Sequence, residues 1–181
     1  MKTQETKWAI DPSHSKVAFK VKHLMISNVL GNFKEFEGQV STTENDFSSA
    51  VINFSLNAAS IDTEIADRDA HLKSADFFDA ENYPKITFSG NGLKDLGDDM
   101  FELTGELTIK EVTKSVTLSV EFGGIGTDPW GNVKAGFSIN GKINRKDFGL
   151  NWNAALEAGG VLVGEEVKIS GDVELVKITN N

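Results

Sequence analysis

Strict alternation of apolar and polar side chains is the feature that most limits how this chain can fold. From Lys16 to Met25, apolar side chains and His23 occupy every second position, and lysines occupy most positions between them. Successive side chains of a β-strand point to opposite faces, so this period of two predicts a strand with one buried face. The pattern recurs to the end of the chain and predicts about eight strands. They are expected at 17–25, 33–40, 52–58, 86–88, 101–110, 116–122, 133–143 and 167–175.

One-sided alternation predicts an antiparallel sheet, because such a sheet can bury one face and leave the other in water. Only one segment departs clearly from the pattern. From Ile65 to Ala75 the apolar positions follow a helical period, and Asp67 is placed to cap the start of a helix. No linker, repeat or low-complexity stretch divides the chain. We therefore expect a single all-β domain over residues 1–181 with one short helix.

A sheet of about eight strands with one apolar face either packs against a second sheet or closes into a barrel. Three glycines, Gly105, Gly141 and Gly171, fall on the inward register in the middle of three different strands. A glycine inside a strand costs about 0.5–1 kcal/mol relative to alanine. These glycines either permit the bends of a closed barrel or leave room for an internal cavity, and the sequence leaves both explanations open.

Length and charge set further limits. The chain has 181 residues, enough for one domain that buries roughly 70% of its unfolded surface. Its net charge is -9, and it has no cluster of lysine and arginine with interleaved aromatics, so no nucleic-acid partner is expected. An anionic membrane would repel such a chain overall, although a local basic patch could form in three dimensions.

The sequence also predicts where the protein resides and which chemistry it lacks. No apolar run approaches the roughly 18 residues of a spanning helix, so no integral membrane segment is expected. The first residues lack the apolar core of a signal peptide, so we expect a cytoplasmic protein. The alternative is a periplasmic protein whose signal peptide has been removed. The absence of cysteine excludes disulfides, thiolate chemistry and cysteine-ligated metals.

Motifs for metals, cofactors and catalysis are missing. The three histidines, His14, His23 and His71, match no compact metal-binding spacing, so no metal site is predicted. His14 follows a DPS turn and is expected to make local hydrogen bonds, and His71 is expected on a solvated or capping face of the helix. The chain carries no G-x-S-x-G elbow, phosphate-binding glycine loop or H-E-x-x-H. We therefore expect no cofactor and no enzymatic activity.

Four regions, in order along the chain, carry a resemblance to a known family. They are WAIDPSHSKVAFKVKHLMISNVLGNFKEFEG near the start, RDAHLKSADFFDAENYPKITF in the middle, LTGELTIKEVTKSVTL after it, and GFSINGKINRKDFGLNW with GGVLVGEEVKIS near the end. Together they resemble the YceI-like family of lipid-binding, lipocalin-like proteins, from about residue 8 to residue 177. Several segments that match in order are more specific than any single motif.

The resemblance implies an eight-stranded antiparallel barrel that encloses an elongated apolar tunnel. Members bind polyisoprenoid chains, isoprenoid quinones or fatty-acid-like amphiphiles, with no known reaction and no catalytic set to carry over. Many are exported to the periplasm and others lack a signal peptide. Dimers occur among them, so a homodimer is left open for this chain. The expected function is therefore to carry or sequester a long apolar lipid inside the barrel.

Two polar residues interrupt the apolar register. His23 is either a core or rim histidine bonded to backbone, or a group at the barrel mouth that donates to a ligand head group. Arg145 either pairs with Asp147, two residues on, or receives a pyrophosphate, quinone oxygen or carboxylate of a bound lipid. Two other functions stay open: an enzyme that acts on a bound isoprenoid lipid through these residues, and a stress or scaffold module with a solid core.

The inward register, assigned from the alternation alone, gives twelve predicted ligand-binding residues. They are Phe19, Val21, His23, Met25, Phe54, Phe88, Phe101, Leu103, Leu118, Phe137, Ile139 and Arg145.

Overall fold

The computed structural model describes residues 2–156 and 160–179, and within these ranges the chain forms twelve β-strands, one α-helix and three short 3-10 helices. The strands are β1 (Glu5–Ile10), β2 (Lys16–His23), β3 (Ser27–Phe33), β4 (Phe36–Thr43), β5 (Asp46–Asn57), β6 (Ile61–Asp62), β7 (Lys85–Asn91), β8 (Lys94–Gly97), β9 (Met100–Ile109), β10 (Val112–Thr127), β11 (Val133–Asn144) and β12 (Val163–Lys177). The helices are α1 (Ala66–Lys73), η1 (Pro12–His14), η2 (Ala58–Ser60) and η3 (Arg145–Phe148).

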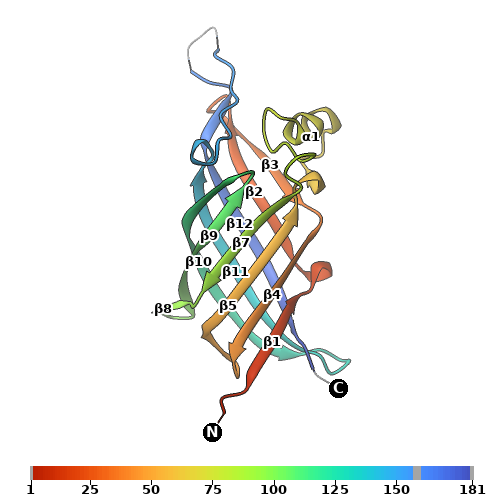
Figure 1. Cartoon of the computed structure of the whole chain (residues 1–181), viewed down its shortest axis with the longest axis vertical. Helices are drawn as coiled ribbons and strands as arrows, with labels where there is room; N and C mark the ends of the chain where they lie inside the picture. Colours follow the sequence, from red (N-terminus) through yellow and green to blue (C-terminus); the bar gives the residue numbers. More distant parts are fainter. Residues whose placement is uncertain (1, 157–159, 180–181) are drawn as a thin grey trace.

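Eight of the strands close into an antiparallel barrel (Figure 1). Hydrogen-bonded neighbours follow the order β1, β4, β5, β7, β9, β10, β11 and β12, and β12 returns to pair with β1. The predicted fold class, an all-β antiparallel barrel with one short helix, is therefore confirmed, and the packed sandwich is excluded. In the part of the chain that the structure describes, no helix has the length and apolarity needed to cross a bilayer.

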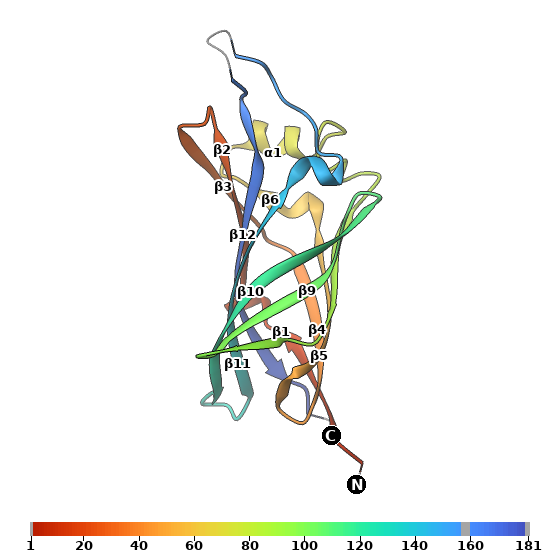
Figure 2. The same cartoon turned by 90° about the vertical axis from the view of Figure 1, so that its left-hand side faces the viewer.

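One wall of the barrel is built in two parts, the β1–β4 pair and the β2–β3 hairpin. β1 leads through η1 into β2, and β3 leads into β4, so the β2–β3 hairpin prolongs the wall that β1 and β4 begin. β12 pairs with both parts of this wall. The C-terminal end of β12 pairs with β1, and its segment from Val163 to Asp172 pairs with β2. The tip of the β2–β3 hairpin and α1 lie at one end of the barrel, and both chain termini lie at the other (Figure 2).

The alternation in the sequence corresponds to the burial in the structure. In β7, Ile86, Phe88 and Gly90 are buried and the residues between them are exposed. The first strand, β1, was not predicted, because ETKWAI places only Trp8 and Ile10 as large apolar side chains on one face. Trp8 is nevertheless fully buried, at 0% exposure, and its indole N–H donates to Thr42 Oγ1 at 3.2 Å.

Two predicted segments differ from the structure. The strand expected at 33–40 is divided: Phe33 ends β3, and β4 begins three residues later. β3 was missed because Gly31 interrupts its apolar face, where a side chain would collide with the ring of Phe19 on the paired strand. The helix is shorter than 65–75, and Asp67 lies in its first turn instead of capping it, because Ile65 occupies the cap position without a side-chain hydrogen bond.

The three inward glycines have different surroundings. A Cβ at Gly105 would overlap the ring of Phe88 and the carbonyl oxygen of Ser89, so this glycine lets an aromatic ring cross the strand. Gly141 is covered in the same way by the side chain of Leu118. Gly171 differs: it lines the internal cavity, and a Cβ placed there would only make ordinary van der Waals contacts, the nearest at 3.4 Å. Two of the glycines therefore serve close packing, and one leaves room.

Replacing Gly105 with alanine is expected to lower the free energy of unfolding by about 1–3 kcal/mol, because the added methyl group forces the Phe88 ring or the strand to shift. Glu106→Ala, at the exposed neighbouring position, is the matched control and should change it by less than about 0.5 kcal/mol. Urea denaturation of the two variants measures the difference. Equal stability of both variants would contradict the packing role of Gly105.

Candidate ligand-binding cavity

The barrel encloses a cavity of about 450 Å³, and residues from all eight barrel strands line it. This volume lies within the range of small-molecule binding sites in proteins. Most of the wall consists of aliphatic and aromatic side chains that the period of two directs inward. The cavity is therefore a direct product of the alternation in the sequence.

The cavity is elongated along the barrel. On β12 alone, its lining runs from Val163 to Leu175. Twelve residue steps at about 3.3 Å make about 40 Å of strand, or about 30 Å along the axis for a strand tilt near 40°. The shape therefore suits an extended chain better than a compact molecule.

Ten of the twelve predicted ligand-binding residues line this cavity. They are Phe19, Val21, His23, Phe54, Phe88, Leu103, Leu118, Phe137, Ile139 and Arg145. Their contact with a ligand stays a prediction, but their placement on the inner wall follows from the register that the sequence predicts.

Met25 and Phe101 do not line the cavity, contrary to the sequence prediction. The alternation of β2 ends at His23, because the chain turns there, and Met25 lies in the turn with 58% of its surface exposed. Phe101 packs against the buried core near the start of β9, where the short β8 strand pairs with it. Both positions lie where a strand starts or ends, and a period of two does not indicate where a strand stops.

Polar side chains that face the cavity gather at the end where α1 lies. The lining there includes four buried or half-buried residues with a cationic or imidazole group: His23, Arg68, His71 and Arg145. Arg68 is held by Thr63, because its Nε donates to the hydroxyl at 2.8 Å and its Nη2 to the carbonyl at 2.7 Å. The opposite end has no comparable group among its described lining residues. The wall therefore has an apolar body and one polar end.

Aromatic side chains near α1 close around His71, a residue that the sequence analysis placed on a solvated or capping face. Its ring lies 4.7 Å from that of Trp152 and 5.1 Å from that of Phe77, in edge-to-face geometry. Its Nε2 lies 3.0 Å from Asp76 Oδ2. His71, Phe77 and Trp152 all line the cavity, and sequence reasoning missed this role. Long-range packing brings Trp152 to the helix, and no local period could reveal it.

Arg145 is 3% exposed, and its guanidinium group is bound by backbone carbonyl groups. Nε donates to Gly164 O at 2.8 Å, and Nη1 donates to Leu150 O at 2.6 Å and to Trp152 O at 2.8 Å. Nη2 donates to Val163 O at 3.3 Å. Four of the five N–H groups thus have partners in the described chain, and one Nη2 hydrogen is left. Arg145 joins the segment after η3 to the start of β12.

The ion pair considered for Arg145 does not form, because Asp147 is exposed and lies outside the cavity. Burial lowers the pKa of the Arg145 guanidinium, and the negative charge of Glu165 acts in the opposite direction. An arginine stays protonated under such a shift, so a positive charge is buried at the polar end of the cavity. Val163 pairs with His23 across the strands, so His23 lies close to the same site.

These features agree with the comparison to known families, in which a sequence model described as the YceI-like domain matches residues 8–175. The chain belongs to the YceI-like family. It is 42% identical over 170 residues to a UPF0312 protein of Staphylococcus epidermidis, covering 93% of this chain and 96% of the relative. A UPF0312 protein of Staphylococcus aureus is 39% identical over 170 residues, with the same coverage. The predicted resemblance is therefore confirmed.

Solved structures share the fold of this YceI-like chain. BcnA of Burkholderia cenocepacia superposes with a TM-score of 0.79 at 25% identity, over 91% of this chain and 98% of that protein. The YceI protein of Campylobacter jejuni gives 0.73 at 34% identity, over 88% and 91%. A polyisoprenoid-binding domain of Saccharophagus degradans, implicated in plant cell wall breakdown, gives 0.66 at 13% identity, over 93% and 97%. At that identity the last likeness shows the fold alone.

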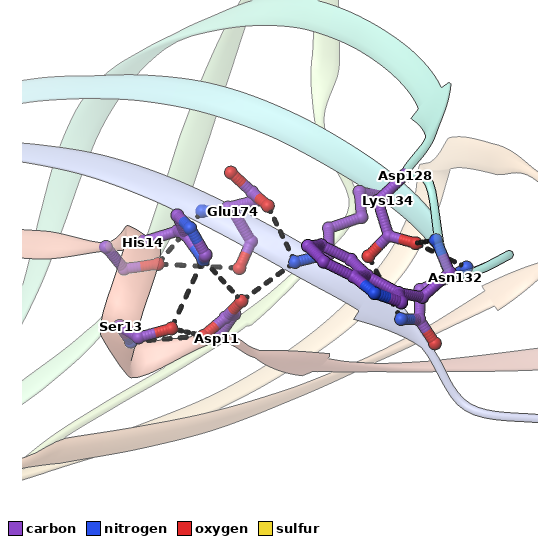
Figure 3. Close-up of polar contacts among 9 residues, drawn as sticks. Asp11, Ser13, His14, Asp128, Asn132, Lys134 and Glu174 are labelled. Carbon is purple, nitrogen blue, oxygen red and sulfur yellow. Dashed lines mark hydrogen bonds and ion pairs between the residues drawn. The ribbon is translucent and has the colours of Figure 1, made fainter.

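A second polar cluster of the YceI-like chain lies where η1 meets β11 and β12 (Figure 3). Asp11, His14 and Glu174 bring ligand-type atoms within 4.8 Å of one another. Lys134 Nζ already lies 2.9 Å from a carboxylate oxygen of Asp11 and 2.9 Å from one of Glu174, so a metal ion would have to displace it. His14 makes the local hydrogen bonds that were expected, to Asp11 at 2.9 Å and to Ser13 at 3.2 Å. The cluster is an ion-pair network that joins η1 to β11 and β12.

Arg145→Gln is expected to lower the free energy of unfolding by about 3 kcal/mol, because glutamine cannot reach all four carbonyls and leaves some of them buried without a donor. Lys146→Gln, which removes only an exposed ion pair with Glu165, should cost less than about 1 kcal/mol. Chemical denaturation followed by circular dichroism measures both values. A loss for Arg145→Gln no greater than for Lys146→Gln would show that the carbonyl contacts are unimportant.

Stability should depend on the charge of Asp11. Hydrogen bonds from Ser13, Lys134 and His14 hold the pKa of Asp11 well below its usual range. A carboxyl group whose pKa is lowered by folding stabilises the native state above its unfolded pKa, and the contribution disappears as pH falls below about 4. Asp11→Asn should therefore lower the thermal midpoint at neutral pH, and the deficit should shrink as the solution is acidified below about pH 4. Asp98→Asn, at an exposed turn position, is the control and should leave the thermal midpoint unchanged. A deficit of Asp11→Asn that is independent of pH would contradict this role of Asp11.

Proposed function

We infer that the protein binds and carries or sequesters a long apolar amphiphile, such as a polyisoprenoid, an isoprenoid quinone or a fatty-acid-like lipid, without changing it chemically. The observation that carries this proposal is the elongated cavity, with an apolar wall along the barrel and its polar groups at one end. An amphiphile has the same division, since its apolar tail is long and its polar head is small. The tail would lie along the barrel, with the head beside His23 and Arg145.

Apolar burial is sufficient to hold such a ligand. A tail that loses about 400 Å² of apolar surface to the cavity gains roughly 10 kcal/mol at about 25 cal/mol per Å². Association costs several kcal/mol in lost translational and rotational freedom, so a surplus remains without any polar contact. The wall would select by length and width, since aliphatic and aromatic side chains distinguish few chemical groups.

The polar end offers contacts to a head group. The imidazole of His23 lines the cavity and makes no hydrogen bond with any residue that the structure describes, and Arg145 retains one N–H group. Either group could donate to a phosphate, carboxylate or quinone oxygen. The solved domain of Saccharophagus degradans, described as polyisoprenoid-binding, has the same fold and supports a ligand of this class.

The two other functions have less support. A solid-core scaffold would fill the barrel, whereas this barrel retains a cavity. An enzyme acting on the bound lipid would need a nucleophile or a general base aligned with a reacting atom. At the polar end, Arg145 is committed mainly to carbonyl groups, and the His71 ring is packed between Phe77 and Trp152 with its Nε2 at Asp76. We therefore propose binding without turnover.

Filling the cavity should abolish binding. Val167 points into the cavity from β12, and Lys168 beside it points outward. Val167→Trp is expected to reduce the affinity for an added prenyl quinone by at least about tenfold, because the indole occupies the space of the tail. Lys168→Trp adds the same group on the outer face and should leave the affinity unchanged. Titration with the quinone, followed by tryptophan quenching or calorimetry, measures both affinities.

Gently purified protein should also retain an extractable apolar molecule, which native mass spectrometry detects as added mass. Protein that is empty and that ignores both prenyl quinone and prenyl pyrophosphate would overturn the proposal. Conversion of prenyl pyrophosphate to a product, abolished by His23→Ala, would instead establish the enzymatic alternative.

A further inference from the structure

The β2–β3 hairpin presents large apolar side chains to solvent at its tip. Its turn consists of Leu24, Met25 and Ile26, of which Met25 is 58% and Ile26 81% exposed. Leu30, on the outer face of β3, is 65% exposed. Large apolar side chains that cluster on a protruding hairpin mark an interaction site more often than isolated ones do.

The backbone of this turn has a conformation that its residue types rarely adopt. Leu24 and Met25 both have positive φ, at 54° and 61°, and Ile26 N donates to His23 O at 3.2 Å to close the turn. Glycine and asparagine adopt this conformation easily, whereas leucine and methionine do so only under strain. A strained turn that keeps apolar residues where polar ones would fit better indicates a function for those side chains.

Charge around the hairpin is opposite to that of the whole protein. Residues 12–34 contain four lysines and no aspartate or glutamate, although the whole chain carries a net charge of -9. Lys20 and Lys22 alternate with the inward residues of β2 and make no ion pair with any described residue. Two acidic groups of the neighbouring segments are paired with other lysines, Asp62 with Lys34 at 3.0 Å and Glu165 with Lys146 at 2.8 Å. The hairpin is therefore a basic patch with an apolar tip.

The hairpin also borders the polar end of the cavity. Leu24 N donates to Leu162 O at 2.9 Å, and His23 pairs with Val163 on β12. His23, Leu162 and Val163 all line the cavity. Figure 2 shows the hairpin at the same end of the barrel as α1, away from the termini. A surface bound by the tip would thus lie beside the part of the wall that carries the polar groups.

We propose that the docking hairpin, residues 20–30, binds an anionic lipid bilayer, with Met25 and Ile26 inserted among the lipids and Lys20 and Lys22 at the head groups. Apolar side chains flanked by lysine suit this interface, because burial of the tip and attraction to anionic lipid add together. The cavity end that carries His23 and Arg145 then faces the membrane. Docking goes beyond lipid carriage and can be measured without any ligand in the cavity.

Flotation with vesicles tests the proposal directly. The protein should float with phosphatidylcholine vesicles that contain phosphatidylglycerol, bind much less to phosphatidylcholine alone, and dissociate at high salt. The double variant Lys20→Gln with Lys22→Gln should bind at least about tenfold more weakly, since each lysine near an anionic surface contributes about fivefold. The double variant Met25→Ser with Ile26→Ser should also lose at least about tenfold.

Matched controls are available at the opposite end of the barrel. Trp130, in the turn before β11, is 83% exposed and lies two residues after the acidic Asp128. Lys94 is exposed on β8. Trp130→Ser and Lys94→Gln should float like the unchanged protein. Because the chain has no cysteine, a polarity-sensitive dye on Ile26→Cys reports insertion, and the same dye on Trp130→Cys should report none.

Two results would overturn the docking proposal. The first is no flotation of the unchanged protein with anionic vesicles at low salt. The second is flotation of the hairpin variants equal to that of the unchanged protein. Circular dichroism and thermal midpoints verify that each variant is folded. Quinone titration without vesicles tests the proposed lipid binding separately, so a protein that binds quinone but not vesicles refutes only the docking.

Discussion

The pairing of β1 with β12 is the constraint on which the rest of the structure depends, because it converts an open sheet into a closed wall. The seam is short: the register joins Trp8, Ala9 and Ile10 to Lys177, Val176 and Leu175. Hydrogen bonds from Asp11 N to Glu174 O and from Ile178 N to Lys7 O extend it on both sides. Without this seam, the edge of β1 and the C-terminal part of the β12 edge would be left exposed, and the barrel would be open along that side. The buried Trp8 and the ion-pair network around Lys134 both stabilise the strands at this seam.

The sequence was sufficient for most of the fold, because a period of two is a local property that a barrel strand cannot avoid. It failed where a strand begins or ends, and at β3, where a glycine interrupts a short apolar face. Gly31 hid β3, because the missing side chain is replaced by the ring of Phe19 from the next strand. Met25 continues the alternation of β2 in the sequence, although the chain has already turned. Closure itself came from the family resemblance, since alternation alone fits a sandwich equally well.

The candidate site could be predicted in its apolar part and not in its polar part. Inward register alone located ten of the lining residues, including Arg145. Arg145 contacts the carbonyl groups of Leu150 and Trp152, which lie in irregular backbone, and those of Val163 and Gly164 at the start of β12. His71 was not expected in the cavity wall, because the ring of Trp152 that packs against it comes from a segment far later in the chain. Contacts of this kind depend on the folded path of loops, and no periodicity encodes that path.

Arg145 has one more consequence for how the polar end of the barrel can move. One side chain ties Leu150, Trp152, Val163 and Gly164 together, so these segments cannot separate one at a time. The rim on that side is stiff, because any opening has to break a group of hydrogen bonds in one event. The side formed by α1 is fastened as well, because Arg68 donates to Thr63 and Asp69 accepts from it, just after β6.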